Sequence, residues 1–115
     1  MGNRAVITLE SSQRKSGTLK KNELGIYLHW HGSPEDVQHL LDLAKEKGVR
    51  NPESDYTYGW ARLCHVIGEA IGGYELSMGV GTLGMLDCAN YDNGVYLFKD
   101  WKIVKQIDSG DVKVS

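Results

Sequence analysis

One short stretch of the sequence gathers most of the side chains that could hold a planar, anionic ligand. Tyr58, Trp60, Arg62 and His65 follow one another closely. A guanidinium binds phosphate or carboxylate through two parallel hydrogen bonds, and aromatic rings stack on flat ligands. The same residues also suit a helix that anchors itself to a core, with Trp60 buried and Arg62 paired with Asp36 or Glu69. Both interpretations remain open from the sequence.

A histidine pair, His29 and His31, flanks a tryptophan at the end of an apolar run. Residues two apart on a strand share a face, so both imidazoles could reach one metal ion. A zinc site needs three or four ligands, and no further ligand is obvious in the sequence. We therefore expect no metal site, and a partly exposed His29 beside a core Trp30.

The patterns that identify enzymes are weak in this chain. Cys64 and His65 are neighbours on an expected helix, where adjacent side chains point about 100° apart, so they form no dyad. Gly79, Gly81 and Gly84 match the spacing of a dinucleotide-binding loop, but a turn signal follows where a helix is required. We expect these glycines to form a flexible loop, and we expect no catalytic residues and no cofactor.

Apolar periodicity predicts the elements that position these residues. Ser33 and Pro34 are typical of a helix start, and Gly48 of a helix end. A second helix is expected from about Thr57 to Ile71, and the polar segment 11–21 reads as a loop or hairpin tip. Alternating and β-branched stretches predict about five strands, at 4–10, 24–30, 74–78, 95–99 and 101–107.

This order, ββααβββ, predicts an α+β fold in a single domain covering residues 1–115. We expect an antiparallel sheet of about five strands with both helices packed on one face, and the other face partly exposed.

Charge and composition exclude several function classes. Thirteen basic and fifteen acidic residues leave a formal net charge of −2, whereas proteins that grip nucleic acid in general usually carry a basic stripe. No apolar run approaches the roughly 20 residues that span a bilayer. With two cysteines and no secretion signal, the protein is expected in the cytoplasm, without a disulfide or a membrane partner.

Four stretches of the chain resemble a family of small proteins from phages and prophages of Gram-positive bacteria. They are the opening MGNRAVIT, then YLHW at 27–30, YGWARL at 58–63 and DNGVY at 92–96. The family commonly has an asparagine where this chain has His31, which argues further against a paired-histidine metal site.

The resemblance implies a phage accessory protein that counters host defence. The leading hypothesis is a non-catalytic sponge that sequesters a nucleotide immune signal, such as a cyclic ADP-ribose derivative, and such a site commonly needs a homo-oligomer. The alternatives are an inhibitor that binds a host defence protein directly, as anti-CRISPR proteins do, and a metal-dependent hydrolase. The residues expected to bind the ligand are Arg4, His29, Trp30, Tyr58, Trp60, Arg62 and Asn93.

Overall fold

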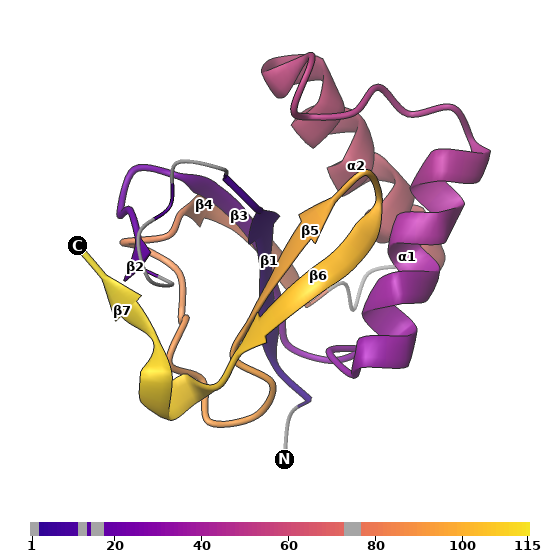
Figure 1. The fold of residues 1–115 in the computed structure, drawn as a ribbon. Coiled ribbons are helices and arrows are strands. Elements are labelled where there is room, and N and C mark those ends of the chain that lie inside the picture. The colour runs from indigo at the N-terminus through magenta and orange to yellow at the C-terminus, as the bar shows by residue number, and fades with distance from the viewer. Residues whose placement is uncertain (1–2, 12–13, 15–17, 73–76) are drawn as a thin grey trace.

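The computed structural model describes residues 3–11, 14, 18–72 and 77–115. Its two helices are α1 (Pro34–Glu46) and α2 (Tyr56–Ile71), and a short 3₁₀ turn covers Ser109–Asp111. The strands in Figure 1 are β1 (Ala5–Leu9), β2 (Thr18–Leu19), β3 (Leu24–Leu28), β4 (Met78–Thr82), β5 (Val95–Lys99), β6 (Lys102–Ile107) and β7 (Lys113–Val114).

The main sheet has five strands in the order β4-β3-β1-β5-β6. The α+β class and the number of strands in this sheet are confirmed, but the expectation of a purely antiparallel sheet is wrong. Strands β1 and β5 run parallel, with Val6 beside Val95 and Leu9 beside Phe98, while the other neighbours are antiparallel. Parallel neighbours need a long crossover connection, and here the chain between β1 and β5 contains both helices.

Helix α1 forms as its sequence predicts. The Ser33 side chain accepts a hydrogen bond from the Asp36 amide, Pro34 occupies the first turn, and two acidic residues face the positive end of the helix dipole. One stripe of the helix is buried against the sheet, and it comprises Val37, Leu40, Leu41 and Ala44.

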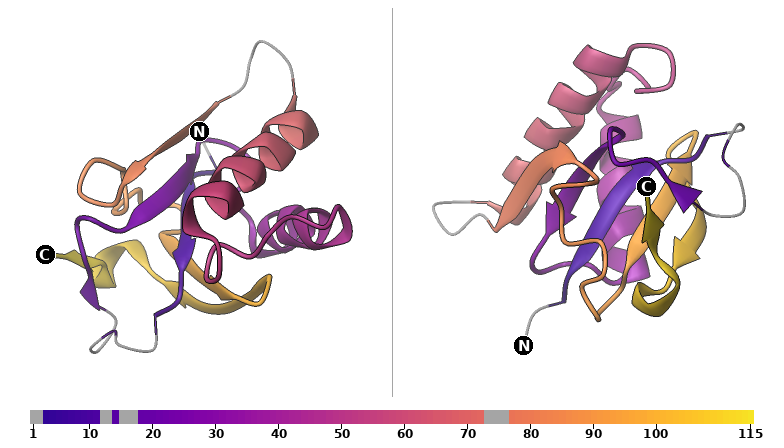
Figure 2. Two further views of the ribbon diagram at one scale, coloured as in Figure 1. Left: turned by 90° about the horizontal axis from the view of Figure 1, so that it is seen from above. Right: turned by 90° about the vertical axis from the view of Figure 1, so that its left-hand side faces the viewer.

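Both helices cover the same face of the sheet, as expected (Figures 1 and 2). The core between the helices and the sheet contains Ile7, Ile26 and Phe98 from three adjacent strands. Ile7 and Ile26 are direct cross-strand partners, which places their side chains on one face.

The opposite face of the sheet is covered over its middle strands and stays exposed toward β6, where the exposed Lys105 is the cross-strand partner of Leu97. Val6 and Leu97 are fully buried there, under Leu19 and Leu83. Leu19 belongs to a small parallel ribbon, β2–β7, which lies on the far side of the sheet from the helices (Figure 1). The covering residues come from segments far apart in the chain, near Leu19, Leu83 and Val114, which is why local patterns did not predict this layer.

Among the described residues, strand β4 shares only Met78 with the strand predicted at 74–78. Residues 74–76 of the expected strand lie outside the described residues, and the observed strand includes Gly79 and Gly81, which were expected in a flexible loop. Both glycines pair with β3, at Tyr27 and Gly25 respectively. The pairing uses backbone groups, so it does not require the β-branched side chains that mark most strands.

Within the described residues, neither helix is long and apolar enough to cross a lipid bilayer.

Candidate functional site

The residues predicted to bind ligand lie in three separate places. The end of the sheet where β1 begins and β3 ends holds Arg4, His29, Trp30 and Asn93. The outer surface of α2 holds Tyr58 and Arg62, and the core holds Trp60. Because the Tyr56 hydroxyl accepts a hydrogen bond from the Leu24 amide, the first turn of α2 lies at the start of β3, away from its His29 end. The residues expected to bind one ligand therefore do not converge on one hollow.

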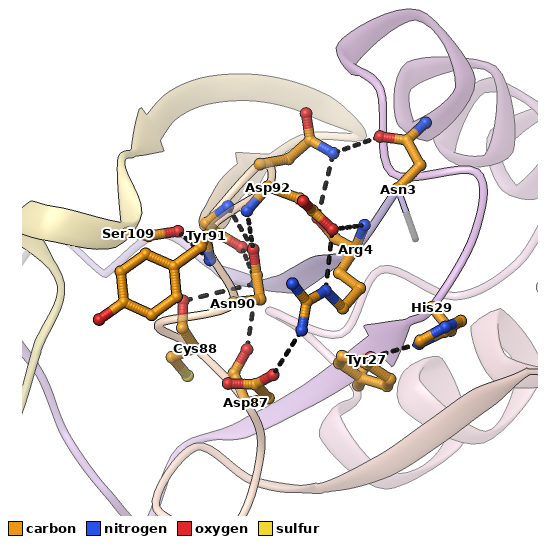
Figure 3. A network of polar contacts seen from close by, with 12 residues as sticks. Asn3, Arg4, Tyr27, His29, Asp87, Cys88, Asn90, Tyr91, Asp92 and Ser109 are labelled. Atoms are coloured by element: carbon orange, nitrogen blue, oxygen red, sulfur yellow. Dashed lines mark hydrogen bonds and ion pairs between the residues drawn. The ribbon is translucent and has the colours of Figure 1, made fainter. Parts of the chain in front are cut away.

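At the end of the sheet, Arg4 is held by two carboxylates (Figure 3). Its Nε lies 2.8 Å from Asp92 Oδ2, its backbone amide donates to the same oxygen at 3.0 Å, and its Nη1 lies 3.6 Å from Asp87. The side-chain hydrogen bond from Arg4 is the main cause of the lowered pKa of Asp92. The positive charge of Arg4 is thus already compensated within the protein.

The loop that carries these two carboxylates is organised by Asn90, whose side chain is fully buried. Its Nδ2 donates to the carbonyls of Asp87 and Gly94, and its Oδ1 accepts from the amides of Asp92 and Gly94. Figure 3 shows Asn90 at the centre of this network. Sequence analysis missed this residue, because a buried asparagine looks like any other turn residue in the sequence.

The Asn93 side chain also makes hydrogen bonds within the protein. Its Nδ2 donates to the carbonyl of Arg4 and to Asn3 Oδ1, which ties the start of β1 to the loop before β5. Its amide group is therefore engaged within the fold.

His29 and Trp30 lie beside this network and contact each other edge to face, with ring centroids 4.8 Å apart. His29 Nδ1 is 2.8 Å from the Tyr27 hydroxyl. Trp30 is 44% exposed, so the expectation of a core tryptophan here is wrong. Strand β3 ends at Leu28 and His31 has a φ of 65°, so the two histidines do not share a strand face.

Among the described residues, no group of three histidine, cysteine, aspartate or glutamate side chains is placed to hold a metal ion. The two cysteines are poorly suited to nucleophilic attack: burial raises the pKa of Cys88 to about 11 and also raises the pKa of Cys64.

Trp60 belongs to the hydrophobic core rather than to a binding surface. It is 3% exposed and meets Phe98 edge to face, with centroids 6.0 Å apart. Its ring is thus out of reach of a ligand that would stack on it, because helix α2 turns this side chain toward the sheet.

On the outer surface of α2, two arginines lie against the ring of Tyr58, which is 54% exposed. The guanidinium carbons of Arg50 and Arg62 are 5.2 and 5.8 Å from the ring centroid, within the range of cation–π attraction. Arg50 also donates to Asp55 at 2.7 Å, whereas Arg62 has no carboxylate within ion-pair distance among the described residues. We call Arg50, Tyr58 and Arg62 the Tyr58 surface.

A hollow of about 400 Å³ adjoins the Tyr58 surface. Arg50 and Arg62 line it together with Lys47, and so do His65 and Glu69, which lie 3.0 Å apart. A hollow lined by three cations beside an exposed ring can hold an anionic group and a planar group at once. The sequence did not identify Lys47 and Arg50, because they lie at a helix end and in a loop without a periodic pattern.

Comparison of the chain with known protein families, with characterised proteins and with solved structures finds no match.

Proposed function

We propose that the protein binds a small phosphorylated ligand with a planar ring at the Tyr58 surface and leaves it chemically unchanged. The observation that carries this proposal is the placement of two guanidinium groups on the exposed Tyr58 ring, beside a hollow that Lys47 also lines. A nucleotide has the matching chemistry, with phosphate for the arginines and a base for the tyrosine.

The charges at this surface favour an anion. Arg62 projects from the helix with the Tyr58 ring as its described contact, so its N–H groups can turn toward a phosphate and bind it through two hydrogen bonds. Arg50 shares its charge with Asp55 and contributes less. Glu69 also lines the hollow, and its carboxylate lies 3.0 Å from His65 Nε2.

The resemblance to small phage proteins supports a specific role for such binding. In this proposal the protein acts in the cytoplasm of a bacterial host and sequesters a nucleotide immune signal, such as a cyclic ADP-ribose derivative. Retention of the intact ligand is sufficient for that role, so no catalytic residue is needed.

Isothermal titration calorimetry with cyclic ADP-ribose, linear ADP-ribose and cyclic dinucleotides tests the proposal, with inorganic phosphate as the control ligand. We expect Arg62→Ala to weaken binding at least about tenfold, since a charged hydrogen bond contributes roughly 1.5–3 kcal/mol. The affinity of Arg62→Lys should lie between those of the wild type and Arg62→Ala, because lysine keeps the positive charge but cannot form two parallel hydrogen bonds. Lys105→Ala, on the exposed side of β6, is the control and should bind normally.

The absence of binding heat with every one of these nucleotides at micromolar protein would reject the ligand class. Binding that survives Arg62→Ala unchanged would reject the Tyr58 surface as its location.

Direct binding to a host defence protein is the second candidate, and the exposure of Trp30 favours it. Tryptophan is enriched at the centres of protein interfaces. A stoichiometric protein recovered from host lysate, and lost with Trp30→Ala, would support this candidate. An ultraviolet-absorbing small molecule that co-purifies with the protein would support the first.

A further inference from the structure

The two edge strands of the main sheet, β6 and β4, differ in the features that prevent pairing with a strand of another chain. Strand β6 carries Lys102 and Lys105, and charged side chains on an edge strand discourage pairing with another chain. The other edge strand, β4, has the sequence MGVGT and no charged residue. Its central residue, Val80, is 58% exposed. Within the described residues, no strand lies beyond β4 in this sheet.

The backbone of β4 has three residues whose amides face outward. His29 N–H donates to Ser77 and Leu83 N–H donates to Glu23, so the odd-numbered residues at both ends of the ladder bond to the β3 side. Bonded and outward-facing residues alternate along an antiparallel strand. Met78 and Val80 therefore turn both backbone groups to the free edge. Thr82 offers only its N–H there, because its carbonyl already accepts from the amides of Met85 and Leu86.

A mainly apolar groove of about 680 Å³ follows this edge, between β4 and α2. Val80 is the cross-strand partner of Ile26, which belongs to the helix-side core, so the Val80 side chain points to the helix side of the sheet. The facing surface of α2 presents small residues at helical spacing, which allow a second backbone to approach closely: Ala61, Cys64 and Gly68.

We propose that β4 pairs with β4 of a second copy of this chain, antiparallel and with the two-fold axis at Val80. The N–H and C=O of Val80 then meet those of Val80 in the other copy, and Met78 lies opposite Thr82. One sheet continues across both copies. Since the axis is perpendicular to the sheet, both α2 helices lie on the same side and face each other across the groove.

Charge complementarity identifies the occupant as a second copy rather than an unrelated strand. His65 and Glu69 lie one turn apart on α2, and both line the groove. When two such helices face each other in opposite directions, His65 of one copy can approach Glu69 of the other, and the reverse contact forms by symmetry. The surface of α2 is thus complementary to itself.

The pairing does not depend on the proposed ligand, but it affects the same part of the molecule. His65 and Glu69 line both the groove and the hollow beside Tyr58. A second copy seated on the groove would therefore stand close to that hollow.

Sedimentation equilibrium of the ligand-free protein over a range of micromolar concentrations tests the pairing, and we expect a mass twice that of the chain. Val80→Lys places a charge at the centre of the edge and should weaken the dimer at least about tenfold. The matched control is Val104→Lys on the opposite edge strand, where Val104 is similarly exposed at 53%. It should leave the dimer unchanged. Circular dichroism and urea unfolding check that both variants fold.

A cysteine cross-link tests the register independently. In a Cys64→Ser background, Val80→Cys should form a disulfide-linked dimer under mild oxidation, because directly opposed strand residues lie about 5.5 Å apart, within disulfide range. Val104→Cys should not.

A folded monomer at every concentration, a dimer insensitive to Val80→Lys, or equal cross-linking at both positions would each overturn the proposal. A monomer that instead captures a different protein at β4 would overturn it as well.

Discussion

Replacing Asn90 with alanine provides the sharpest test of the network at the end of the sheet. The Asn90 side chain makes four hydrogen bonds of 3.0–3.1 Å to backbone groups of its own loop. Alanine removes all four. The buried Gly94 amide then loses its acceptor, whereas the Gly94 carbonyl keeps the hydrogen bond from the Val6 amide.

The magnitude follows from these contacts. A buried hydrogen bond contributes about 1 kcal/mol net, and a buried group left unsatisfied costs about 1–3 kcal/mol. The two bonds to Gly94 are buried, whereas those to Asp87 and Asp92 are partly buried and can be replaced by water. We therefore expect Asn90→Ala to lower the free energy of unfolding by about 3 kcal/mol, a large part of the 5–15 kcal/mol typical of a domain.

Urea unfolding followed by circular dichroism measures this loss. With a slope of roughly 1.5 kcal/mol per molar urea, the midpoint should fall by about 2 M. Asn51→Ala is the matched control: the Asn51 side chain accepts one exposed hydrogen bond from Glu53, so its loss should cost at most about 1 kcal/mol. If the free energy of unfolding of Asn90→Ala lies within about 1 kcal/mol of the wild-type value, and its dependence on urea concentration is unchanged, Asn90 does not organise the loop.

Three further outcomes are expected. Gly94→Ala should lower the unfolding temperature more than an alanine substitution at an exposed position does, or prevent folding. A Cβ there would lie 2.0 Å from a backbone oxygen of β6, and φ is +69°. Thermal unfolding measures this effect. Burial alone would raise the pKa of Glu23, but hydrogen bonds from Arg14 and from a backbone amide lower it below its ordinary 4.5. The Glu23 contribution to stability should therefore be complete above about pH 4.5 and lost as the pH falls through the folded-state pKa. In Glu23→Gln, the free energy of unfolding measured in urea should fall less over the same acid range. Tyr96→Phe should lower the free energy of unfolding by about 1–2 kcal/mol, since the buried Tyr96 hydroxyl donates to the Gly32 carbonyl at 2.7 Å. Burial raises the pKa of Tyr96 to about 12, so a phenolate absorbance change from Tyr96 at pH 10 would contradict this environment.

Residues near one another in the chain predicted local structure well. The cap at Ser33 and the proline that follows it determine where α1 begins, and the apolar stripe determines which side is buried, because these effects act within a few residues. Strand β4 shows the limit of such patterns: Gly79 and Gly81 are poor strand formers, and they are extended because β3 offers backbone partners.

The candidate site was predicted only in part. Aromatic and arginine residues at 58–62 identified a surface of α2, but the sequence could not show that Trp60 turns inward or that Arg50 approaches Tyr58 from the preceding loop. Arg4 was expected to bind the ligand, yet it pairs with Asp92, a residue distant in the chain.

By itself, the sequence determined the helix boundaries, the apolar faces and the α+β class, since these follow from interactions between close neighbours along the chain. Only the tertiary structure decided that β1 runs parallel to β5, that a second layer covers the middle strands on the far face of the sheet, and which charged groups remain available to a ligand. These features depend on contacts between distant segments, and the energy of such contacts has no signature in any single stretch of residues.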